Sequence, residues 1–139
     1  MSQFVLDASV ALAWYVDNPM PPYAKLVKDA LEQGRSAIAP AVWSLEMANG
    51  LHMADRRGNL TAEQVDWGLQ QLELLTRAVV EIEIQWFSVR EAFVAAKSFR
   101  LTAYDAVYLE LARHRGLPLA TLDNELRAAA GRLRVGIFR

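Results

Sequence analysis

Short apolar segments that alternate with longer helical segments restrict the fold of this chain more than any other feature of its sequence. The run from Gln3 to Leu6 is short and apolar and leads straight into an acid, as expected of a buried strand. Such strands, when separated by helices, form parallel sheets whose two faces are both covered. The predicted strands are residues 3–6, 37–39, 79–84, 119–121 and 135–137. A length of 139 residues fits one α/β domain, residues 1–139.

Helix start and stop signals separate these strands. Thr61 and Gln64 have the spacing of a capping box, and Gly34 and Gly116 stand where helices are expected to end. The predicted helices are residues 8–16, 23–32, 41–57, 61–77, 87–99, 103–115 and 124–130.

Composition and charge exclude several classes of function. The chain has no cysteine, which rules out disulfides, thiolate zinc sites and a cysteine nucleophile. It has no signal-peptide pattern at its start and no apolar run near the ~20 residues of a membrane helix, so we expect a cytoplasmic protein without membrane contact. The net charge of −1 leaves no broad basic surface for nucleic acid. Any RNA would have to be held by local basic patches and bound cations.

Acidic residues fall at the positions where parallel α/β sheets bind ligands. Asp7 ends the first predicted strand, and Asp123 lies just beyond a later one. Glu46 and Asp105 lie near the starts of helices that begin at the same edge of the sheet. Ligands bind at the carboxyl edge of such sheets, so we expect the four acids to meet there.

Glu46 and Asp105 lack an obvious basic partner on their own helices. The residues three and four positions from Glu46 are Val42, Trp43, Asn49 and Gly50. A partly buried carboxylate without a counter-charge is unfavourable, and a metal ion would supply that charge. The simpler alternative is that Glu46 is a solvated surface residue.

The other three acids also have simpler explanations. Asp7 has the position of a helix N-cap, and Asp105 follows Thr102 at the spacing of a capping box. Asp123 is placed either to cap a helix or to pair with Arg127 one turn later. These alternatives remain open from the sequence alone.

Four short motifs, taken in order, resemble the PIN-domain family, and most of all the VapC-type toxins, which are the ribonucleases of toxin–antitoxin pairs. The resemblance extends from Phe4 to about Val135. Its motifs are Asp7-Ala8-Ser9, Glu46 followed by Asn49, Tyr104-Asp105-Ala106 and Thr121-Leu122-Asp123.

The resemblance implies a fold and a metal site. The fold would be a three-layer α/β/α sandwich around a parallel sheet of four to five strands. The site would hold one or two Mg²⁺ or Mn²⁺ ions, with Asp7, Glu46 and Asp105 at the three core acidic positions and Asp123 at a more variable fourth. The residues expected to support these acids from the second layer of the site are Ser9, Asn49 and Thr121.

The resemblance also implies partners: an RNA substrate, a cognate antitoxin protein and a second copy of the chain in a homodimer. By analogy, the loop from Tyr15 to Tyr23 and the helix after it are expected to bind the antitoxin. The arginines considered for RNA phosphates are Arg100, Arg127, Arg132, Arg134 and Arg139. His52 and His114 stand alone, without metal-ligand spacing, and surface roles are expected for them.

The alternative function is a PIN-like protein-interaction module without catalysis, in which the acids serve only as helix caps. A phosphatase with an aspartyl nucleophile is disfavoured, because that mechanism needs a second aspartate two residues after the first and this chain has Ser9 there.

Overall fold

The computed structural model describes residues 3–78, 80–84 and 87–139, and these form strands and helices in alternation. The strands are β1 (Gln3–Leu6), β2 (Ser36–Pro40), β3 (Val80–Glu83) and β4 (Leu119–Ala120). The helices are α1 (Ala8–Val16), α2 (Pro22–Glu32), α3 (Trp43–Arg56), α4 (Ala62–Ala78), α5 (Val89–Phe99), α6 (Ala103–Arg115) and α7 (Asn124–Arg132).

The four strands form one parallel sheet in the order β3-β2-β1-β4. Val5 of β1 pairs with Ile38 on one side and with Leu119 on the other. Because all pairs are parallel, the carboxyl ends of the four strands share one edge of the sheet. The segments that follow β1 and β4, which are far apart in the sequence, are therefore neighbours.

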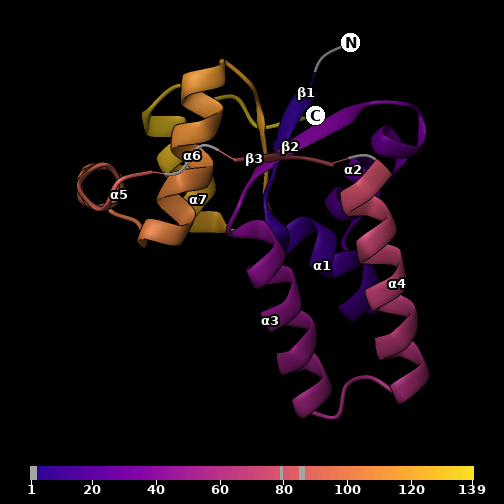
Figure 1. The fold of residues 1–139 in the computed structure, drawn as a ribbon. Coiled ribbons are helices and arrows are strands. Elements are labelled where there is room, and N and C mark those ends of the chain that lie inside the picture. The colour runs from indigo at the N-terminus through magenta and orange to yellow at the C-terminus, as the bar shows by residue number, and fades with distance from the viewer. Residues whose placement is uncertain (1–2, 79, 85–86) are drawn as a thin grey trace.

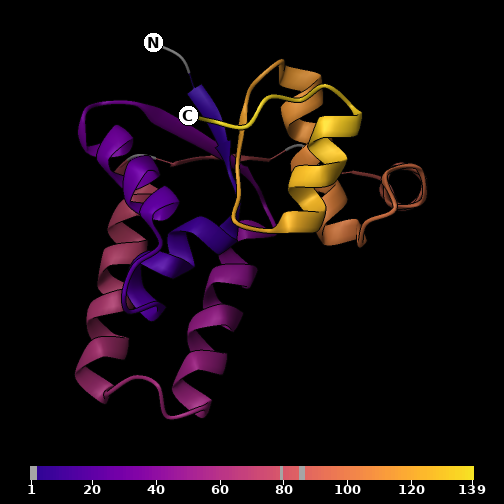
Figure 2. The same cartoon turned by 180° about the vertical axis from the view of Figure 1, so that it is seen from behind.

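Helices cover both faces of this sheet. Figures 1 and 2 show α5, α6 and α7 on one side and α1, α2 and α4 on the other, with α3 and α4 running side by side below the sheet. Helix α6 packs against β1, β2 and β4. The sheet is covered on both faces, as the alternation of strands and helices predicts, and the three layers are those that the family resemblance implies.

Most predicted boundaries lie within two residues of the observed ones. The capping box at the start of α4 is confirmed, since the Thr61 hydroxyl accepts from the Gln64 amide at 3.1 Å and the Gln64 side chain accepts from the Thr61 amide at 2.8 Å. Helix α5 begins later than predicted because Ser88 caps it, accepting from the Glu91 amide. Val79, the first residue of the predicted strand at 79–84, lies outside the described residues.

The predicted fifth strand at 135–137 is wrong as a strand. Ile137 makes one isolated parallel bridge to Leu119, and Phe138 donates to the Leu119 carbonyl. Strand β4 has only two residues, so a neighbouring segment can pair with it over only a short length. Besides these backbone contacts, two side-chain contacts hold the segment: the Phe138 ring stacks on Phe4, and the Tyr23 hydroxyl donates to the Phe138 carbonyl.

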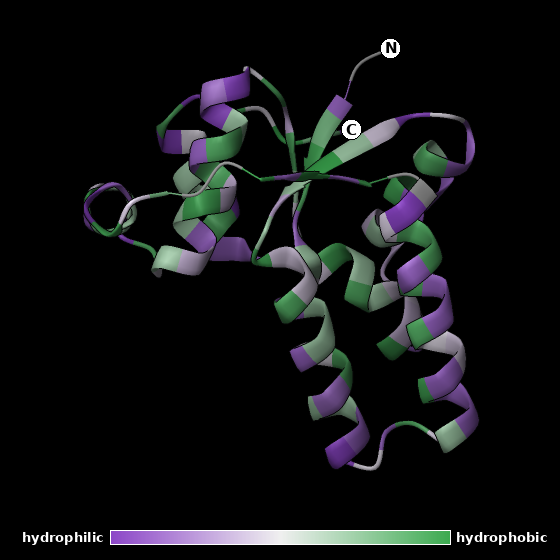
Figure 3. Cartoon of the chain, in the orientation of Figure 1, coloured by the Kyte–Doolittle hydropathy of each residue, from purple (hydrophilic) through white to green (hydrophobic). Residues whose placement is uncertain are grey.

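The core lies between the sheet and the helices on both sides. Its largest fully buried side chains include Phe4, Leu6, Ile38, Tyr108 and Leu109. Figure 3 shows β1 and β2 coloured largely hydrophobic and the far end of α3 hydrophilic. Within the described ranges, no helix combines the length and the apolar character that spanning a membrane requires.

Replacement of Leu109 by alanine should lower the free energy of unfolding by about 3 kcal/mol, because it leaves a cavity where α6 packs on the sheet. Urea denaturation measures the change. The matched control is Leu45→Ala, at a leucine that is 73% exposed, and it should cost less than about 0.5 kcal/mol. Equal losses in the two variants would contradict this packing.

Candidate active site

The carboxyl edge of the sheet brings the two ends of the acidic pattern together. Asp7 directly follows β1, and its backbone amide donates to the Ala120 carbonyl at the end of β4 at 2.9 Å. Asp123 lies three residues beyond Ala120, at the N-cap of α7. The parallel pairing of β1 with β4 thus places both aspartates at one edge, as the sequence predicted.

Two hydroxyl groups hold the carboxylate of Asp7. Ser9 and Thr121 each donate to its Oδ2 atom at 2.7 Å. Asp7 is only 5% exposed and Thr121 is fully buried. Although Asp7 has the N-cap position of α1, its side chain makes no capping hydrogen bond. Helix capping therefore does not explain this buried acid.

The same hydroxyls connect the two segments that meet here. Ser9 accepts from the Leu122 amide at 3.0 Å, and Thr121 accepts from the Asp123 amide at 3.0 Å. The two hydroxyl oxygens lie 3.4 Å apart. Ser9 and Thr121 therefore fix the orientation of Asp7 and also the path of the chain that leads to Asp123.

Asp123 caps α7, as one of its two simpler explanations proposed. Its Oδ1 atom accepts from the Leu126 amide at 3.0 Å. The other explanation, a pair with Arg127, is wrong: the Nε of Arg127 donates to the Thr121 carbonyl at 2.7 Å. The guanidinium group of Arg127 lies over the ring of Tyr23, 4.4 Å from its centre.

Glu46 lies in the first turn of α3 and receives a hydrogen bond that sequence reasoning missed. The hydroxyl of Tyr108 donates to its Oε1 atom at 2.6 Å. Tyr108 is fully buried on α6, three residues after Asp105. That spacing places the two on one helix face, and it is the only signal by which the sequence could have linked Tyr108 to the site.

Asp105 lies in the first turn of α6. Its amide donates to the Thr102 hydroxyl at 3.2 Å, so the capping interaction predicted for this pair is present. The cap engages the backbone of Asp105. The pKa of the Asp105 carboxyl is raised to about 6. Burial is the largest cause, and the negative charges on Asp123 and Asp7 raise the pKa further.

The four acids repel one another. The pKa of Glu46 is raised to about 7, chiefly by burial; the charges on Asp7 and Asp105 also raise it, and the hydrogen bond from Tyr108 partly opposes them. Burial likewise raises the pKa of Asp7, against the two hydroxyl hydrogen bonds and together with the charge on Asp123. Side chains that shift each other in this way lie close together in a poorly solvated region.

No basic side chain relieves this repulsion within the described residues. Ion pairs of the described residues join other side chains: Lys25 with Asp29, Lys28 with Glu32, Arg113 with Glu110 and Arg115 with Glu83. Uncompensated carboxylates with shifted pKa values are a feature of functional sites.

Comparison with known proteins identifies the family of this chain. The family model described as PIN domain matches residues 4–132. The chain belongs to the PIN-domain family. Ribonuclease VapC3 from Pyrobaculum aerophilum is 30% identical over 124 residues, which cover 89% of this chain and 92% of that protein. Ribonuclease VapC3 from Mycobacterium tuberculosis is 31% identical over 132 residues, covering 91% and 87%.

A solved structure supports the same fold. The crystal structure of PAE2754 from Pyrobaculum aerophilum superposes with a TM-score of 0.68 at 20% sequence identity, covering 92% of this chain and 84% of that one. At this level of identity the likeness concerns the fold alone.

The donor set of this PIN domain suits a hard cation. Carboxylate oxygens are the ligands that Mg²⁺ and Mn²⁺ prefer, and a divalent ion would supply the positive charge that the acids lack. In residues 3–78, 80–84 and 87–139, no three His, Cys, Asp or Glu side chains are arranged as a ready set of metal ligands. Ligation partly through water would suit acids that converge without forming such a set.

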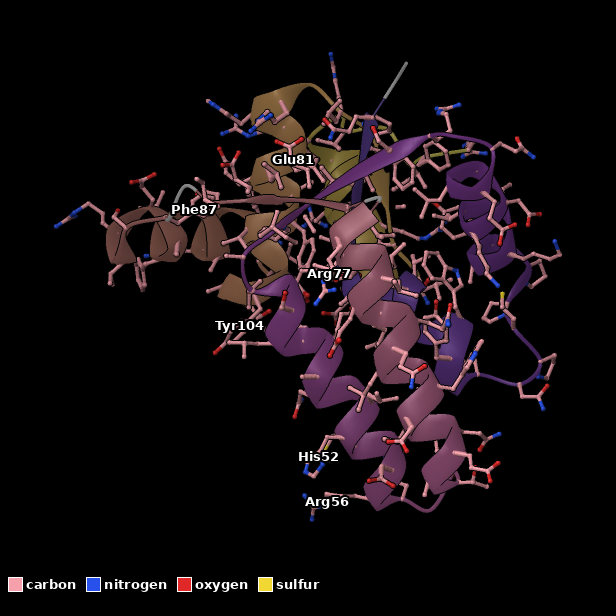
Figure 4. All side chains as sticks on the ribbon, turned by 45° about the vertical axis from the view of Figure 1, so that its right-hand side comes forward. His52, Arg56, Arg77, Glu81, Phe87 and Tyr104 are labelled. Atoms are coloured by element: carbon pink, nitrogen blue, oxygen red, sulfur yellow. The ribbon has the colours of Figure 1, made fainter. Side chains whose placement is uncertain are left out.

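Two other polar residues of this PIN domain lie on α3, after Glu46 in the sequence. Asn49 is exposed on α3, one turn after Glu46. Figure 4 shows His52 near the far end of α3, next to Arg56 and away from the sheet, whereas Tyr104 lies at the start of α6. His52 therefore belongs to the surface, as expected.

The raised pKa values predict that the metal-free domain loses stability as the pH rises. Because Glu46 binds its proton more tightly folded, with a pKa of about 7 against 4.5 in a model compound, its stabilising contribution is full below pH 4.5 and is lost as the pH rises through 7. At pH 7.5 without metal, Glu46→Gln should therefore melt roughly 3 °C above the wild type, as ~1 kcal/mol would produce.

The gain should shrink at pH 5, and calorimetry in EDTA at both pH values measures it. Asp66→Asn, at an exposed acid of α4, is the control and should change neither value. The raised pKa of Glu46 would be contradicted if the melting temperature of the wild type, compared with that of Glu46→Gln, were higher at pH 7.5 than at pH 5.

Proposed function

We propose that this PIN domain is a metal-dependent endoribonuclease and the toxin of a toxin–antitoxin pair. The observation that carries the proposal is the acidic group at the edge of the sheet: the pKa values of Asp7, Glu46 and Asp105 are raised by burial and by neighbouring acids, and no basic side chain of the described residues pairs with them. The two relatives named Ribonuclease VapC3, which match about nine-tenths of the chain, support the choice of RNA as substrate.

In this proposal Asp7, Glu46, Asp105 and Asp123 hold one or two Mg²⁺ or Mn²⁺ ions, directly or through water. When bound, such an ion neutralises charge on the phosphodiester and lowers the pKa of a nearby water. Ser9 and Thr121 keep the carboxylate of Asp7 oriented through their 2.7 Å hydrogen bonds. Asn49 is proposed as a supporting group of Glu46.

RNA phosphates would be held mainly by the cation, because the chain has a net charge of −1. Among the arginines considered for this task, Arg127 and Arg132 donate to the backbone carbonyls of Thr121 and Phe99. Their guanidinium groups thus already serve the fold. The remaining three, Arg100, Arg134 and Arg139, are exposed.

We place the antitoxin on the surface between α1, α2 and α4. A hollow of about 260 Å³ lies there, lined by Trp14, Tyr15, Leu31, Leu74 and Leu75 among others. It adjoins the loop that begins at Tyr15, and an apolar partner segment would fit its lining. A cytoplasmic location would follow from this partnership.

We place the homodimer contact on α5. Val89 is 89% exposed and Phe93 is 64% exposed, and their spacing of four residues puts them on one face of the helix. A second copy of the chain would cover this face.

Asp7→Asn and Asp105→Asn should each lower RNA cleavage by roughly 10²–10³-fold, because each removes a charge that holds the cation. The assay is cleavage of total RNA with Mn²⁺, with sequencing of the new ends. Asp66→Asn is the control acid and should cleave as the wild type does. Chelation by EDTA should abolish the wild-type activity.

Expression in cells separates this proposal from the non-catalytic module. The wild type should arrest growth, and Asp7→Asn should relieve the arrest while still binding the protein encoded beside the gene. A wild type that binds that partner but cleaves no RNA at any Mn²⁺ concentration would favour the interaction module.

Phe93→Glu should convert the dimer to a monomer, because it places a charge in the proposed contact. Size-exclusion chromatography with light scattering measures the mass. Leu74→Glu, at an exposed leucine of α4, should leave the dimer intact. A wild type that is monomeric at high micromolar concentration would refute the contact on α5.

A further inference from the structure

The Tyr108 hydroxyl joins two helices beneath the acids. Tyr108 belongs to α6 and Glu46 to α3, 62 positions apart in the sequence, and a 2.6 Å hydrogen bond links the hydroxyl to Oε1. The Tyr108 side chain is fully buried. A buried tyrosine hydroxyl needs a partner, and the partner chosen here is one of the four acids rather than a backbone carbonyl.

The hydroxyl lies near more than one of these acids. The charges on Asp7 and on Glu46 both act on it, and with burial they raise the pKa of Tyr108 far above its ordinary value. The group therefore stays protonated and acts as a hydrogen-bond donor toward Glu46. Helix α6 thus supplies the site with two groups from one face, the carboxylate of Asp105 and the hydroxyl of Tyr108.

The hydrogen bond from Tyr108 uses the Oε1 atom of Glu46 and leaves the Oε2 atom available to another partner. Oε2 accepts no hydrogen bond from the residues described here, and the carboxyl group is only partly buried. A glutamate in the first turn of a helix has several side-chain rotamers, which differ in where they place the carboxylate. A donor on a rigid, buried ring selects among them.

We infer that Tyr108 is a positioning residue, whose hydroxyl holds Oε1 of Glu46 so that the second carboxylate oxygen faces the divalent cation. The inference rests on the proposed metal-dependent function. Tyr108 itself would touch neither the ion nor the RNA. Groups of this kind, which orient a metal ligand from behind, affect metal affinity tenfold or more when they are lost.

The test is Tyr108→Phe, which removes the hydroxyl and keeps the ring. Thermal melting at increasing Mn²⁺ gives the concentration that produces half of the full stabilisation, and this should rise about tenfold. The matched control is Tyr23→Phe, which removes the hydroxyl that donates to the Phe138 carbonyl at 2.8 Å, a hydrogen bond that involves none of the four acids. It should lower the metal-free melting temperature without changing the Mn²⁺ midpoint.

The double variant Tyr108→Phe/Glu46→Gln tests whether Tyr108 affects metal affinity through Glu46. If Tyr108 acts through Glu46, then Tyr108→Phe should cause no further rise of the Mn²⁺ midpoint in the Glu46→Gln background. A further tenfold rise there, or a single variant that behaves as Tyr23→Phe does, would overturn the positioning role. A wild type without any Mn²⁺ response would instead remove the metal site itself, and the role with it.

A measurement on the unaltered side chain covers the case in which Tyr108→Phe does not fold. The chain has four tyrosines, so labelling with [ζ-¹³C]tyrosine gives a spectrum of four signals that single substitutions can assign. The Tyr108 signal should move on addition of Mg²⁺ in the wild type and stay in place in Glu46→Gln. A Tyr108 signal that ignores Mg²⁺ while the protein is stabilised by it would overturn the inference.

Discussion

The hydrogen bond from the Thr121 hydroxyl to the Asp7 carboxylate, across 114 positions of sequence, is the contact on which the acidic site depends. It exists because β1 and β4 are parallel neighbours, so that the residues following both strands leave the sheet at the same edge. The same threonine accepts the amide of Asp123, and its own carbonyl receives Arg127. One residue thus connects the first acid, the last acid and the base of α7.

The acids themselves work against the stability of the fold. Asp7, Glu46 and Asp105 lie where burial and neighbouring acids favour the protonated form, and the hydroxyls of Ser9, Thr121 and Tyr108 offset only part of that cost. A chain that needed only helix caps at these positions would have no reason to accumulate this repulsion. The arrangement makes physical sense for a site that is completed by a cation.

Sequence reasoning succeeded where local pattern decides the structure. Strand ends placed Asp7 and Asp123 at one edge, and helix starts placed Glu46 and Asp105 there too. Sequence reasoning failed where a side chain binds a partner from a distant segment and not the neighbour on its own helix. The spacing of Asp123 and Arg127 suggests an ion pair, but the Thr121 carbonyl and the Tyr23 ring, which the helix pattern does not reveal, take the guanidinium.

The sequence could not predict the contact between Tyr108 and Glu46 for a similar reason, because it depends on how α3 and α6 approach each other at the edge of the sheet. The strand predicted at 135–137 failed because β4 is only two residues long, and the length of a ladder depends on both partners. Apolar character alone does not tell a strand that pairs along its length from a segment that makes a single bridge.

The strand order also has a consequence for the time at which the site is assembled. A ribosome makes β1, β2 and β3 before β4, and β4 pairs with β1 at the end of the sheet. A growing chain that has reached the end of α6 already carries Asp7, Glu46 and Asp105, but Thr121 has not yet been added. Until it is, Asp7 lacks one of its two hydroxyl donors, so the acidic centre is finished only when the late segment after β4 docks beside the first strand.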